Sequence, residues 1–204
     1  MITIIDYGAG NIKSIQNMLK RIGFASNIAN TPSEIESSNK LILPGVGHFD
    51  YGMQQLKKSG LIDIINKRVI KDKIPILGIC LGAQLLGNAS EEGVEMGLGW
   101  IDMNIVRFSK NQMGSTMKIP HMSWNTINIT KKSKLTIDLP SIPRFYFVHT
   151  FHMKPNSNSV VLSTTNYGYE FVSAVEKDNI YGVQFHPEKS HKYGLKLLEN
   201  FSKL

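Results

Sequence analysis

The sequence predicts an α/β fold in which a mostly parallel β-sheet is flanked by helices and carries an antiparallel extension. In the first half, short apolar runs alternate with helical patterns, which is the order of βαβ units and hence of a parallel sheet. In the second half, strand-like runs follow one another between turns rich in Asn, Ser, Gly and Pro, as in antiparallel sheets. No linker, repeat or low-complexity stretch interrupts the chain, so we expect one domain over residues 1–204.

The first half is expected to contain four strands and four helices. Its strands are short apolar runs with β-branched residues. Asn11 is placed to cap the first helix, Gly23 to end it, and Pro44-Gly45 to stop the third strand. The expected strands cover residues 2–6, 24–29, 40–43 and 74–79. The expected helices cover residues 12–22, 49–57 and 61–71, and a fourth begins near Leu81.

The second half is expected to contain six short strands and one closing helix. The helix is amphipathic, because Leu195, Leu198 and Phe201 fall on one face. The expected strands cover residues 100–108, 126–129, 145–149, 160–164, 171–176 and 180–184, and the helix covers residues 191–203.

Composition narrows the classes of function. One cysteine, Cys80, excludes an internal disulfide framework and fits a reducing cytoplasm. The chain has no run of about 18 apolar residues and so no expected membrane span, and its N-terminus lacks the features of a signal peptide. The net charge of +7 comes from scattered lysines without a basic stripe, so we expect no nucleic-acid partner. A basic face could instead meet an acidic protein.

The sharpest local feature is Gly78-Ile79-Cys80-Leu81-Gly82, between an expected strand and an expected helix. This is the form of a nucleophile elbow with cysteine as the nucleophile, and its glycines are needed because a Cβ at either flank would strike neighbouring backbone. The helix that follows would favour the thiolate, and the Leu81 amide could hold an oxyanion. The same short pattern is also compatible with a small buried hydrophobic cysteine.

A second feature, Gln184-Phe185-His186-Pro187-Glu188, also follows a strand. A cysteine nucleophile needs a base, and the base needs an orienting acceptor. In extended chain, residues i and i+2 point to the same side, so Glu188 is expected to accept from one ring nitrogen of His186 while the other faces Cys80. Alone the segment also fits a surface loop, but the two features match complementary roles.

Other polar residues are less specific. The turn Pro44-Gly45-Val46-Gly47 could bring a second oxyanion donor or be a plain βα turn. His149 is expected to be structural or to line a substrate site, and His121 has no assigned role. No pair of residues has metal-ligand spacing, and Gly8-Ala9-Gly10 lacks the third glycine of a dinucleotide loop, so neither a metal nor a cofactor is expected.

A series of motifs runs in order along nearly the whole chain. They occupy residues 6–11, 44–47, 78–86, 90–93, 120–122, 124–125, 146–149 and 184–190. As a set they resemble the class I (triad) glutamine amidotransferases, and within them the glutaminase subunits of imidazole glycerol phosphate synthases. The resemblance implies a class I glutamine amidotransferase-like fold.

The resemblance also implies roles for individual residues. The Cys80 thiolate would attack the side-chain amide of L-glutamine, His186 would protonate the leaving ammonia and then activate water, and Glu188 would orient His186. Residues implied in holding glutamine and the oxyanion are Gly45, Val46, Gly47, Leu81, Gln84, Glu92, Thr150 and Phe151.

The implied partner is a (β/α)8-barrel synthase subunit in a heterodimer. It would use the ammonia to make imidazole glycerol phosphate and an aminoimidazole ribonucleotide in histidine biosynthesis. Residues implied at the interface are Asn11, Trp124, Tyr146 and Lys189.

Two residues depart from the usual pattern of that family. Ser123 stands where glycine is usual, beside the expected interface, and Phe151 stands where tyrosine is common. Three alternatives remain: the same glutaminase chemistry feeding a synthase for surface-sugar amidation, a non-catalytic binding subunit on an amidotransferase fold, and a hydrolase of another amide or peptide. The complete set of Cys80, His186 and Glu188 counts against the non-catalytic alternative.

Overall fold

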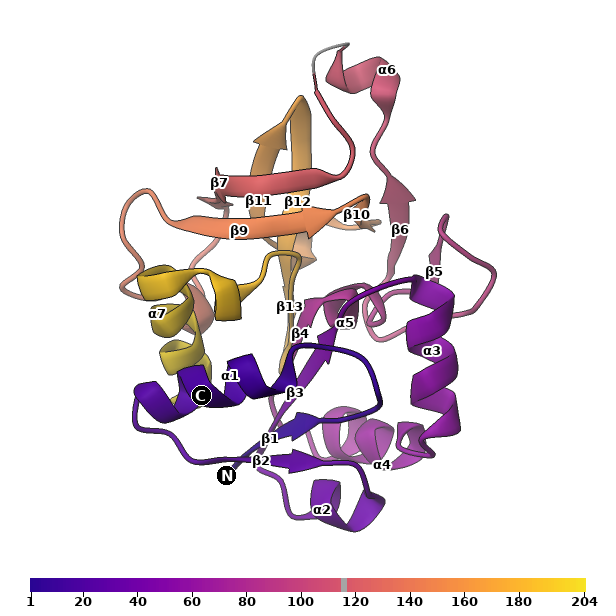
Figure 1. Cartoon of the computed structure of the whole chain (residues 1–204), viewed down its shortest axis with the longest axis vertical. Helices are drawn as coiled ribbons and strands as arrows, with labels where there is room; N and C mark the ends of the chain where they lie inside the picture. The colour runs from indigo at the N-terminus through magenta and orange to yellow at the C-terminus, as the bar shows by residue number, and fades with distance from the viewer. Residues whose placement is uncertain (115–116) are drawn as a thin grey trace.

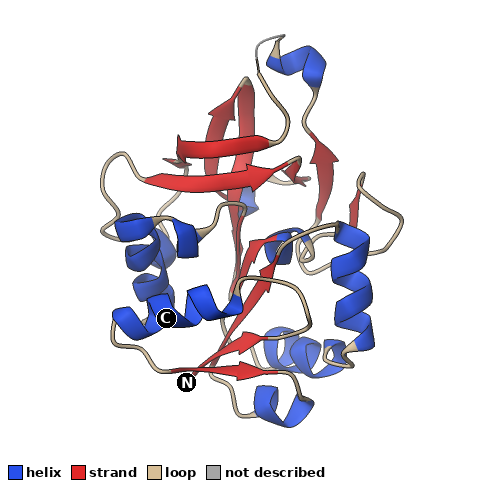
Figure 2. Cartoon of the chain, viewed as in Figure 1, coloured by secondary structure: helices blue, strands red, loops and turns tan. Residues whose placement is uncertain are grey.

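The computed structural model describes residues 1–114 and 117–204, and in this part of the chain helices flank one mixed β-sheet (Figure 1, Figure 2). The sheet has the order β2-β1-β3-β4-β13-β12-β10-β6-β5, and β11 and β8 extend it beside β12. Neighbours from β2 to β13 are parallel, whereas β12 pairs antiparallel with β13, β10 and β11. The predicted fold class is therefore confirmed.

The parallel half is built from βα units. Its strands are β1 (Ile2–Ile5), β2 (Ser26–Ala29), β3 (Lys40–Gly45) and β4 (Ile76–Cys80). Its helices are α1 (Ile12–Arg21), α2 (Pro32–Glu36), α3 (Phe49–Lys58), α4 (Ile62–Asn66) and α5 (Leu81–Gln84), with a π-helical turn at Lys67–Lys71.

The second half supplies the antiparallel extension, and its last strand, β13, returns to pair with β4. The strands are β5 (Ala89–Ser90), β6 (Met103–Arg107), β7 (His121–Thr126), β8 (Asn128–Ile129), β9 (Arg144–His149), β10 (Phe151–Pro155), β11 (Val161–Tyr167), β12 (Tyr169–Lys177) and β13 (Ile180–Val183). The helices are α6 (Lys110–Met113) and α7 (His191–Ser202).

Two buried clusters lie on opposite faces of the parallel strands. Along β3, Leu41 and Leu43 pack in the cluster that contains α3 and α4, whereas Ile42 packs in the cluster that contains α1 and α7. A parallel sheet covered on both faces buries both sets of side chains. This explains why the sequence shows continuous apolar runs at these strands.

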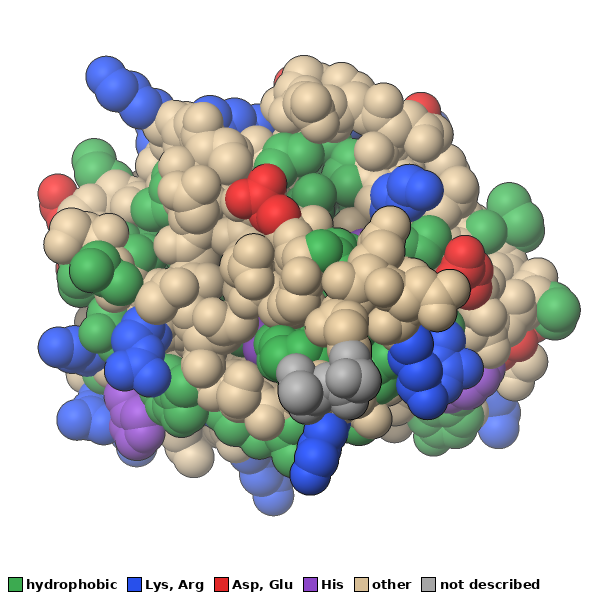
Figure 3. Space-filling view, turned by 90° about the horizontal axis from the view of Figure 1, so that it is seen from above, with side chains coloured by type: hydrophobic (Ala, Val, Ile, Leu, Met, Phe, Trp, Pro, Cys, Tyr) green, Lys and Arg blue, Asp and Glu red, His purple; other side chains and the backbone are tan. Residues whose placement is uncertain are grey.

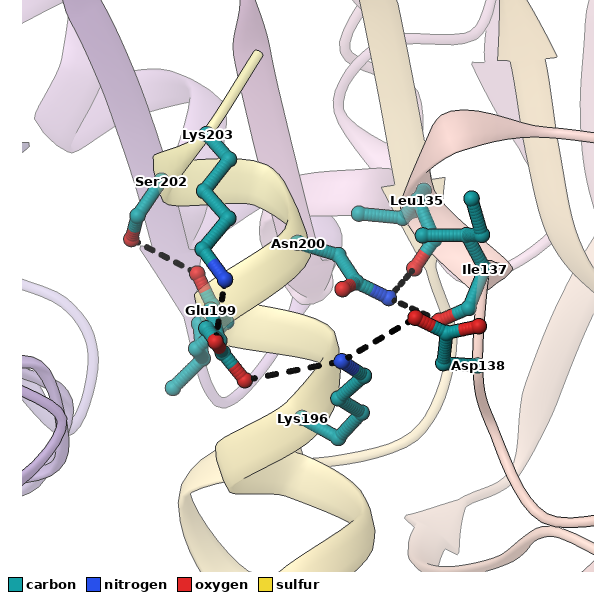
Figure 4. A network of polar contacts seen from close by, with 9 residues as sticks. Leu135, Ile137, Asp138, Lys196, Glu199, Asn200, Ser202 and Lys203 are labelled. Carbon is teal, nitrogen blue, oxygen red and sulfur yellow. Dashed lines mark hydrogen bonds and ion pairs between the residues drawn. The ribbon is translucent and has the colours of Figure 1, made fainter.

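Polar contacts join the C-terminal helix α7 to the loop before β9 (Figure 4). The Asn200 side-chain amide donates to the carbonyls of Leu135, at 3.1 Å, and Ile137, at 2.6 Å. Lys196 bridges Asp138 and Glu199 at 3.6 Å each. These contacts hold the helix that follows the His186 segment against the body of the protein.

One strand boundary and one helix cap predicted at the site are wrong. Strand β3 continues through Pro44 to Gly45 instead of stopping before them. Proline is tolerated because β1 pairs only with Lys40–Ile42, so no neighbour on that side needs the missing amide. Asn11 occupies the N-cap position of α1 without making a side-chain cap, because its amide donates to Glu188 at 3.3 Å.

The sequence also misses several elements. Strands β7 (residues 121–126) and β10 were not expected, whereas the expected strand 126–129 contains the short strand β8 at residues 128–129. Strand β7 pairs with β9 in a separate two-stranded sheet, and its side chains are mostly polar or half-buried, so they lack the apolar alternation of a covered strand. The expected helix 61–71 is divided into α4 and the π-helical turn.

Positive charge is spread over the surface. On the face shown in Figure 3, Lys and Arg side chains lie at several separate places and form no continuous stripe. Among the described helices, none combines the length and the apolar character that crossing a membrane requires.

Strands β3 and β4 and helix α5 approach one another through glycine. A Cβ on Gly82 would lie 1.9 Å from the carbonyl oxygen of Leu43, and one on Gly45 would lie 2.6 Å from the amide nitrogen of Gly82. A Cβ on Gly78 would lie 2.7 Å from the carbonyl oxygen of Gly82. The expected need for glycine on both sides of Cys80 is confirmed, and the collision partners are backbone atoms that cannot rotate away.

We predict that Gly82→Ala lowers the free energy of unfolding by about 3 kcal/mol, at the upper end for an overpacked site. The matched control is Gly60→Ala, whose Cβ would meet no atom within 4 Å and whose φ is +69°. The control should lose only about 1 kcal/mol through its left-handed backbone. Urea unfolding followed by circular dichroism measures both, and equal losses would contradict the packing account.

Candidate active site

Cys80 lies at the junction of β4 and α5 in a backbone conformation that L-residues rarely adopt. Its φ is 53° and its ψ is −111°, and the residue is 7% exposed. Such a turn is held by its surroundings, here the glycine contacts with β3. Helix α5 is a single turn. The Cys80 sulfur therefore lies near the first amides of that turn and not at the end of a long helix.

His186 and Glu188 form a buried pair. His186 Nδ1 lies 2.7 Å from Glu188 Oε1, and each side chain is 1% exposed. Residues Pro187–Lys189 form a 3₁₀ turn, so the pairing arises from a turn and not from the extended chain that the sequence analysis assumed. A carboxylate can only accept, so Nδ1 carries the proton and Nε2 faces the other way.

The electrostatics of His186 depend on its neighbours. Burial alone would lower the pKa of the imidazole, but the Cys80 sulfur and the Glu188 carboxylate together raise it to about 10. Nε2 and Glu188 Oε2 are buried and have no hydrogen-bond partner among the described residues. The ring is thus stabilised as an imidazolium next to the sulfur, with one nitrogen available to a further group.

The backbone of His186 is held by strand β9. The His186 amide donates to the carbonyl of Tyr146 at 2.9 Å. The Ser190 hydroxyl donates to the carbonyl of His186 at 2.6 Å and accepts from the amide of Tyr146 at 3.0 Å. The main chain of Tyr146 and the hydroxyl of Ser190 therefore fix the backbone that carries the imidazole.

A pocket of about 490 Å³ opens over Cys80 and His186. Its size is within the range of small-molecule sites. The residues that line it are Asn11, Val46, Gly47, Cys80, Leu81, Gln84, Glu92, Pro120, Val148, His149, Thr150, Phe151, His186 and Lys189.

Most residues expected to hold the substrate line this pocket, but Gly45 does not. Gly45 is the buried end of β3 and lies under Gly82. Its role is to permit that contact, while Val46 and Gly47 reach the pocket. The Tyr7 hydroxyl donates to the carbonyl of Pro44 at 2.7 Å, just before this turn.

Glu92 reaches the pocket from a loop that is fixed to α3. Its Oε2 accepts from the amide of Phe49 at 2.8 Å. Asp50 accepts from the amides of Val94 and Glu95 at 3.0 and 2.9 Å, which lowers the pKa of its carboxyl. These bonds place a carboxylate at the pocket edge, where it can meet a cationic group.

The four expected interface residues fall into two groups. Trp124 of β7 pairs across the two-stranded sheet with Tyr146 of β9, and Lys189 Nζ lies 5.7 Å from the centre of the Tyr146 ring. Trp124 also stacks on His191 with ring centres 5.5 Å apart. Asn11 is separate from this group and contacts Glu188 instead.

Two further polar side chains lie at the site: Gln184, to which the sequence analysis gave no role, and His149. The Gln184 side-chain amide donates toward the Cys80 sulfur at 3.8 Å, and Gln184 Oε1 accepts from Gln84 at 3.0 Å. His149, expected only as a structural or lining residue, lies in the pocket wall and bonds His121. Both residues are polar and lie at the end of a buried strand, and this was the only sign of a role in the sequence. Sequence alone cannot distinguish such a residue from an ordinary turn residue.

Metal chemistry gains no support from the geometry. Within residues 1–114 and 117–204, no group of three or more His, Cys, Asp or Glu side chains is arranged to hold a metal ion. The arrangement instead combines a nucleophile, a proton-carrying imidazole and an orienting carboxylate. This set can perform covalent acyl transfer.

Comparisons with known proteins agree with this geometry. Residues 3–204 match the model of the family described as "Glutamine amidotransferase class-I". The chain is 55% identical over 203 residues to "Imidazole glycerol phosphate synthase subunit HisH 2" of Methanococcus maripaludis, covering 100% of this chain and 99% of that protein. It is 48% identical to a HisH 2 subunit of Pseudomonas aeruginosa, with 100% of both chains covered.

The fold is similar to that of solved amidotransferases. "Structure of PurLQS from Thermotoga maritima" matches with a TM-score of 0.75 and 18% identity, covering 98% of this chain and 96% of that chain. At this identity the likeness concerns the fold alone. Because the family model and the relatives both extend over nearly the whole chain, the chain belongs to the class-I glutamine amidotransferases and, within them, to the HisH subunits of imidazole glycerol phosphate synthase.

Proposed function

We propose that the chain is a glutaminase subunit that hydrolyses L-glutamine to glutamate and ammonia and passes the ammonia to a synthase subunit of histidine biosynthesis. The observation that carries the proposal is a cysteine on a strained elbow in the same pocket as a buried imidazole–carboxylate pair. Full-length HisH relatives at 44 to 55% identity support the pathway.

The proposed reaction has two halves. The Cys80 thiolate attacks the amide carbon of glutamine, and the resulting oxyanion is held by the Leu81 amide and the Val46–Gly47 turn. His186 Nε2–H protonates the leaving nitrogen, so ammonia departs and a thioester remains. The neutral His186 then takes a proton from water, the hydroxide attacks the thioester, and glutamate leaves as the thiolate is restored. Glu188 holds the ring throughout.

The proposed substrate pose follows from the pocket walls. The Glu92 carboxylate would meet the α-ammonium group of glutamine, and its fixed loop keeps it in place. Gln84 and the main chain of Thr150 and Phe151 would line the side opposite the oxyanion turn. The proposed mechanism uses only the backbone of Phe151, so the absence of a tyrosine hydroxyl removes no group from it.

The proposed partner is a (β/α)8-barrel subunit that forms a heterodimer with this chain. Relatives are named as subunits of a synthase, which implies a further chain in those proteins. Trp124, Tyr146 and Lys189 lie together beside the pocket, and Met122 on the same strand is 58% exposed. A partner seated there would close the pocket and receive ammonia without its release to water.

We further propose that residues 1–204 act as one domain in the cytoplasm. The two core clusters share the same sheet, so neither half has a core of its own. The free thiol of Cys80 fits a reducing compartment.

Replacement of Cys80 by alanine or serine should abolish glutamine hydrolysis, with a loss of about 10⁴-fold or more, as for other nucleophiles in triads. Synthase activity supported by ammonium salt should remain, because ammonia bypasses the missing thioester. Steady-state assays with each nitrogen source measure both. Full glutaminase activity in Cys80→Ala would sink the proposal.

His186→Ala should reduce glutamine-dependent activity more than Glu188→Gln, because His186 transfers protons while Glu188 orients the ring. Glu188→Gln keeps an acceptor oxygen near Nδ1, so a partial rate should survive. Paired assays with glutamine and with ammonium salt make the comparison. An equal loss with both nitrogen sources would mean that the two residues support the fold or the partner instead.

Glutamine hydrolysis by the isolated chain should be slow and should rise strongly when the cognate barrel subunit and its ligand are added. Trp124→Ala should weaken this stimulation more than basal hydrolysis, because the indole lies outside the pocket wall. Tyr51→Ala, which removes a 48% exposed aromatic ring from α3, is the matched control and should leave the stimulation unchanged.

Ammonia release with and without candidate barrel subunits provides the measurement. A fully active isolated chain that no barrel subunit affects would favour a free-standing amidase. If only a barrel subunit from surface-sugar amidation stimulates the chain, the chain would be assigned to that amidation and not to histidine biosynthesis.

A further inference from the structure

Two buried histidines next to the pocket take no part in the proposed chemistry. His121 comes from β7 and His149 from β9, and the two residues face each other in the register of the two-stranded sheet. His121 Nδ1 lies 3.1 Å from His149 Nε2. His121 is fully buried and His149 is 6% exposed. Contact between two rings at this distance requires one nitrogen to donate and the other to accept.

The direction of this bond follows from its inner end. His149 Nδ1 lies 2.8 Å from the carbonyl oxygen of Phe151, which can only accept, so Nδ1 carries a proton. Burial lowers the pKa of His149 well below its usual value, and the neighbouring His121 lowers it further. The neutral ring then offers Nε2 as an acceptor, and His121 Nδ1 must be the donor.

The outer end fits the same direction. Burial lowers the pKa of His121 to about 4, so this ring is also neutral and its Nε2 accepts. The Asn125 side-chain amide lies 3.4 Å from that nitrogen and also donates to the carbonyl of Asn166 at 2.9 Å. Asn125 follows Trp124 on β7. The chain of bonds therefore begins beside the proposed partner surface.

At its inner end the chain meets the catalytic elbow. The Phe151 carbonyl accepts a second bond from Gln84 Nε2 at 3.1 Å. Gln84 Nε2 also donates to Gln184 Oε1 at 3.0 Å, and the Gln184 amide donates toward the Cys80 sulfur at 3.8 Å. Two donors thus fix a carbonyl that belongs to the main chain lining the pocket.

We propose that His121 and His149 are positioning residues, whose one-directional hydrogen-bond chain holds the Phe151 carbonyl and, through it, Gln84 in the orientation that glutamine binding needs. The inference rests on the proposed glutaminase activity and adds two residues to it. Without the His149 donor, the peptide between Phe151 and His152 loses one of the two bonds that set its direction. The effect should fall on substrate binding more than on bond breaking.

Packing and hydrogen bonding by His121 can be separated. The ring stacks on Phe147 at 4.8 Å and on Tyr167 at 3.9 Å between centres. Phenylalanine keeps an aromatic ring in this stack and removes the donor. Asparagine keeps a donor near the Nδ1 position and removes the ring. His121→Phe therefore tests the hydrogen bond alone, and His121→Asn tests the ring stacking alone.

His152 offers a matched control for the loss of a buried imidazole. It is 6% exposed and packs against Phe108, as His149 does, at ring-centre distances of 4.8 and 5.1 Å respectively. Its nitrogens bond the Met153 carbonyl and the Tyr169 hydroxyl, so it lies outside the chain of bonds. His152→Phe therefore replaces a buried imidazole by a phenyl ring in the same aromatic cluster, without removing a bond of the chain.

The experiment measures kcat and KM for glutamine in the complex with the cognate synthase subunit. His121→Phe should raise KM about five- to ten-fold, the size of one lost hydrogen bond, while kcat changes by less than about two-fold. His121→Asn should restore most of the KM, His152→Phe should leave it unchanged, and all variants should keep the ammonium-dependent rate. Thermal unfolding verifies that each variant is folded.

Nitrogen NMR of histidine-labelled protein provides a second readout at neutral pH. The proton should be found on Nδ1 of both His121 and His149. A proton on Nε2 of His149 would overturn the direction of the chain. An unchanged KM in His121→Phe, or equal increases in the Phe, Asn and His152→Phe variants, would overturn the positioning role. A complex that hydrolyses no glutamine even with Cys80 intact would instead contradict the proposed function, and the NMR result would then decide the inference.

Discussion

The site depends on backbone packing against backbone where β3, β4 and α5 meet. Gly45 and Gly82 leave no side chain between the end of β3 and the elbow, and a Cβ on Gly82 would reach 1.9 Å from the Leu43 carbonyl. This contact keeps Cys80 at a positive φ and brings the Leu81 amide near the Val46–Gly47 turn. A longer separation would leave the thiol in the pocket but would move away the backbone amides that we propose as oxyanion donors.

The second support of the site is the small sheet of β7 and β9. Its inner strand holds the His186 backbone through the Tyr146 carbonyl, and its two strands supply His121 and His149. The same pair of strands presents Trp124 beside the pocket. The backbone of His186, one wall of the pocket and the proposed partner surface therefore all contact this small sheet, which gives partner binding a short mechanical path to the pocket.

Much of the fold followed from hydrophobic pattern. The buried strands of the parallel half are continuous apolar runs because both of their faces are covered. The hydrophobic pattern failed to predict β7. The side chains of this strand are mostly polar or half-buried, and it pairs outside the main sheet. The pattern also failed at α2, which was not predicted, although Thr31 and Glu34 form a capping box, a signal that is local in the sequence.

The sequence by itself determined the elbow, the order of the triad motifs and the need for glycine around Cys80, because these depend on residues adjacent along the chain. Only the tertiary structure decided which groups meet across distant segments. Asn11 bonds Glu188 instead of capping its helix, Gln184 reaches the Cys80 sulfur, and His121 bonds His149. The direction of a buried hydrogen bond depends on what each atom faces, and sequence spacing carries no information about partners brought together by folding.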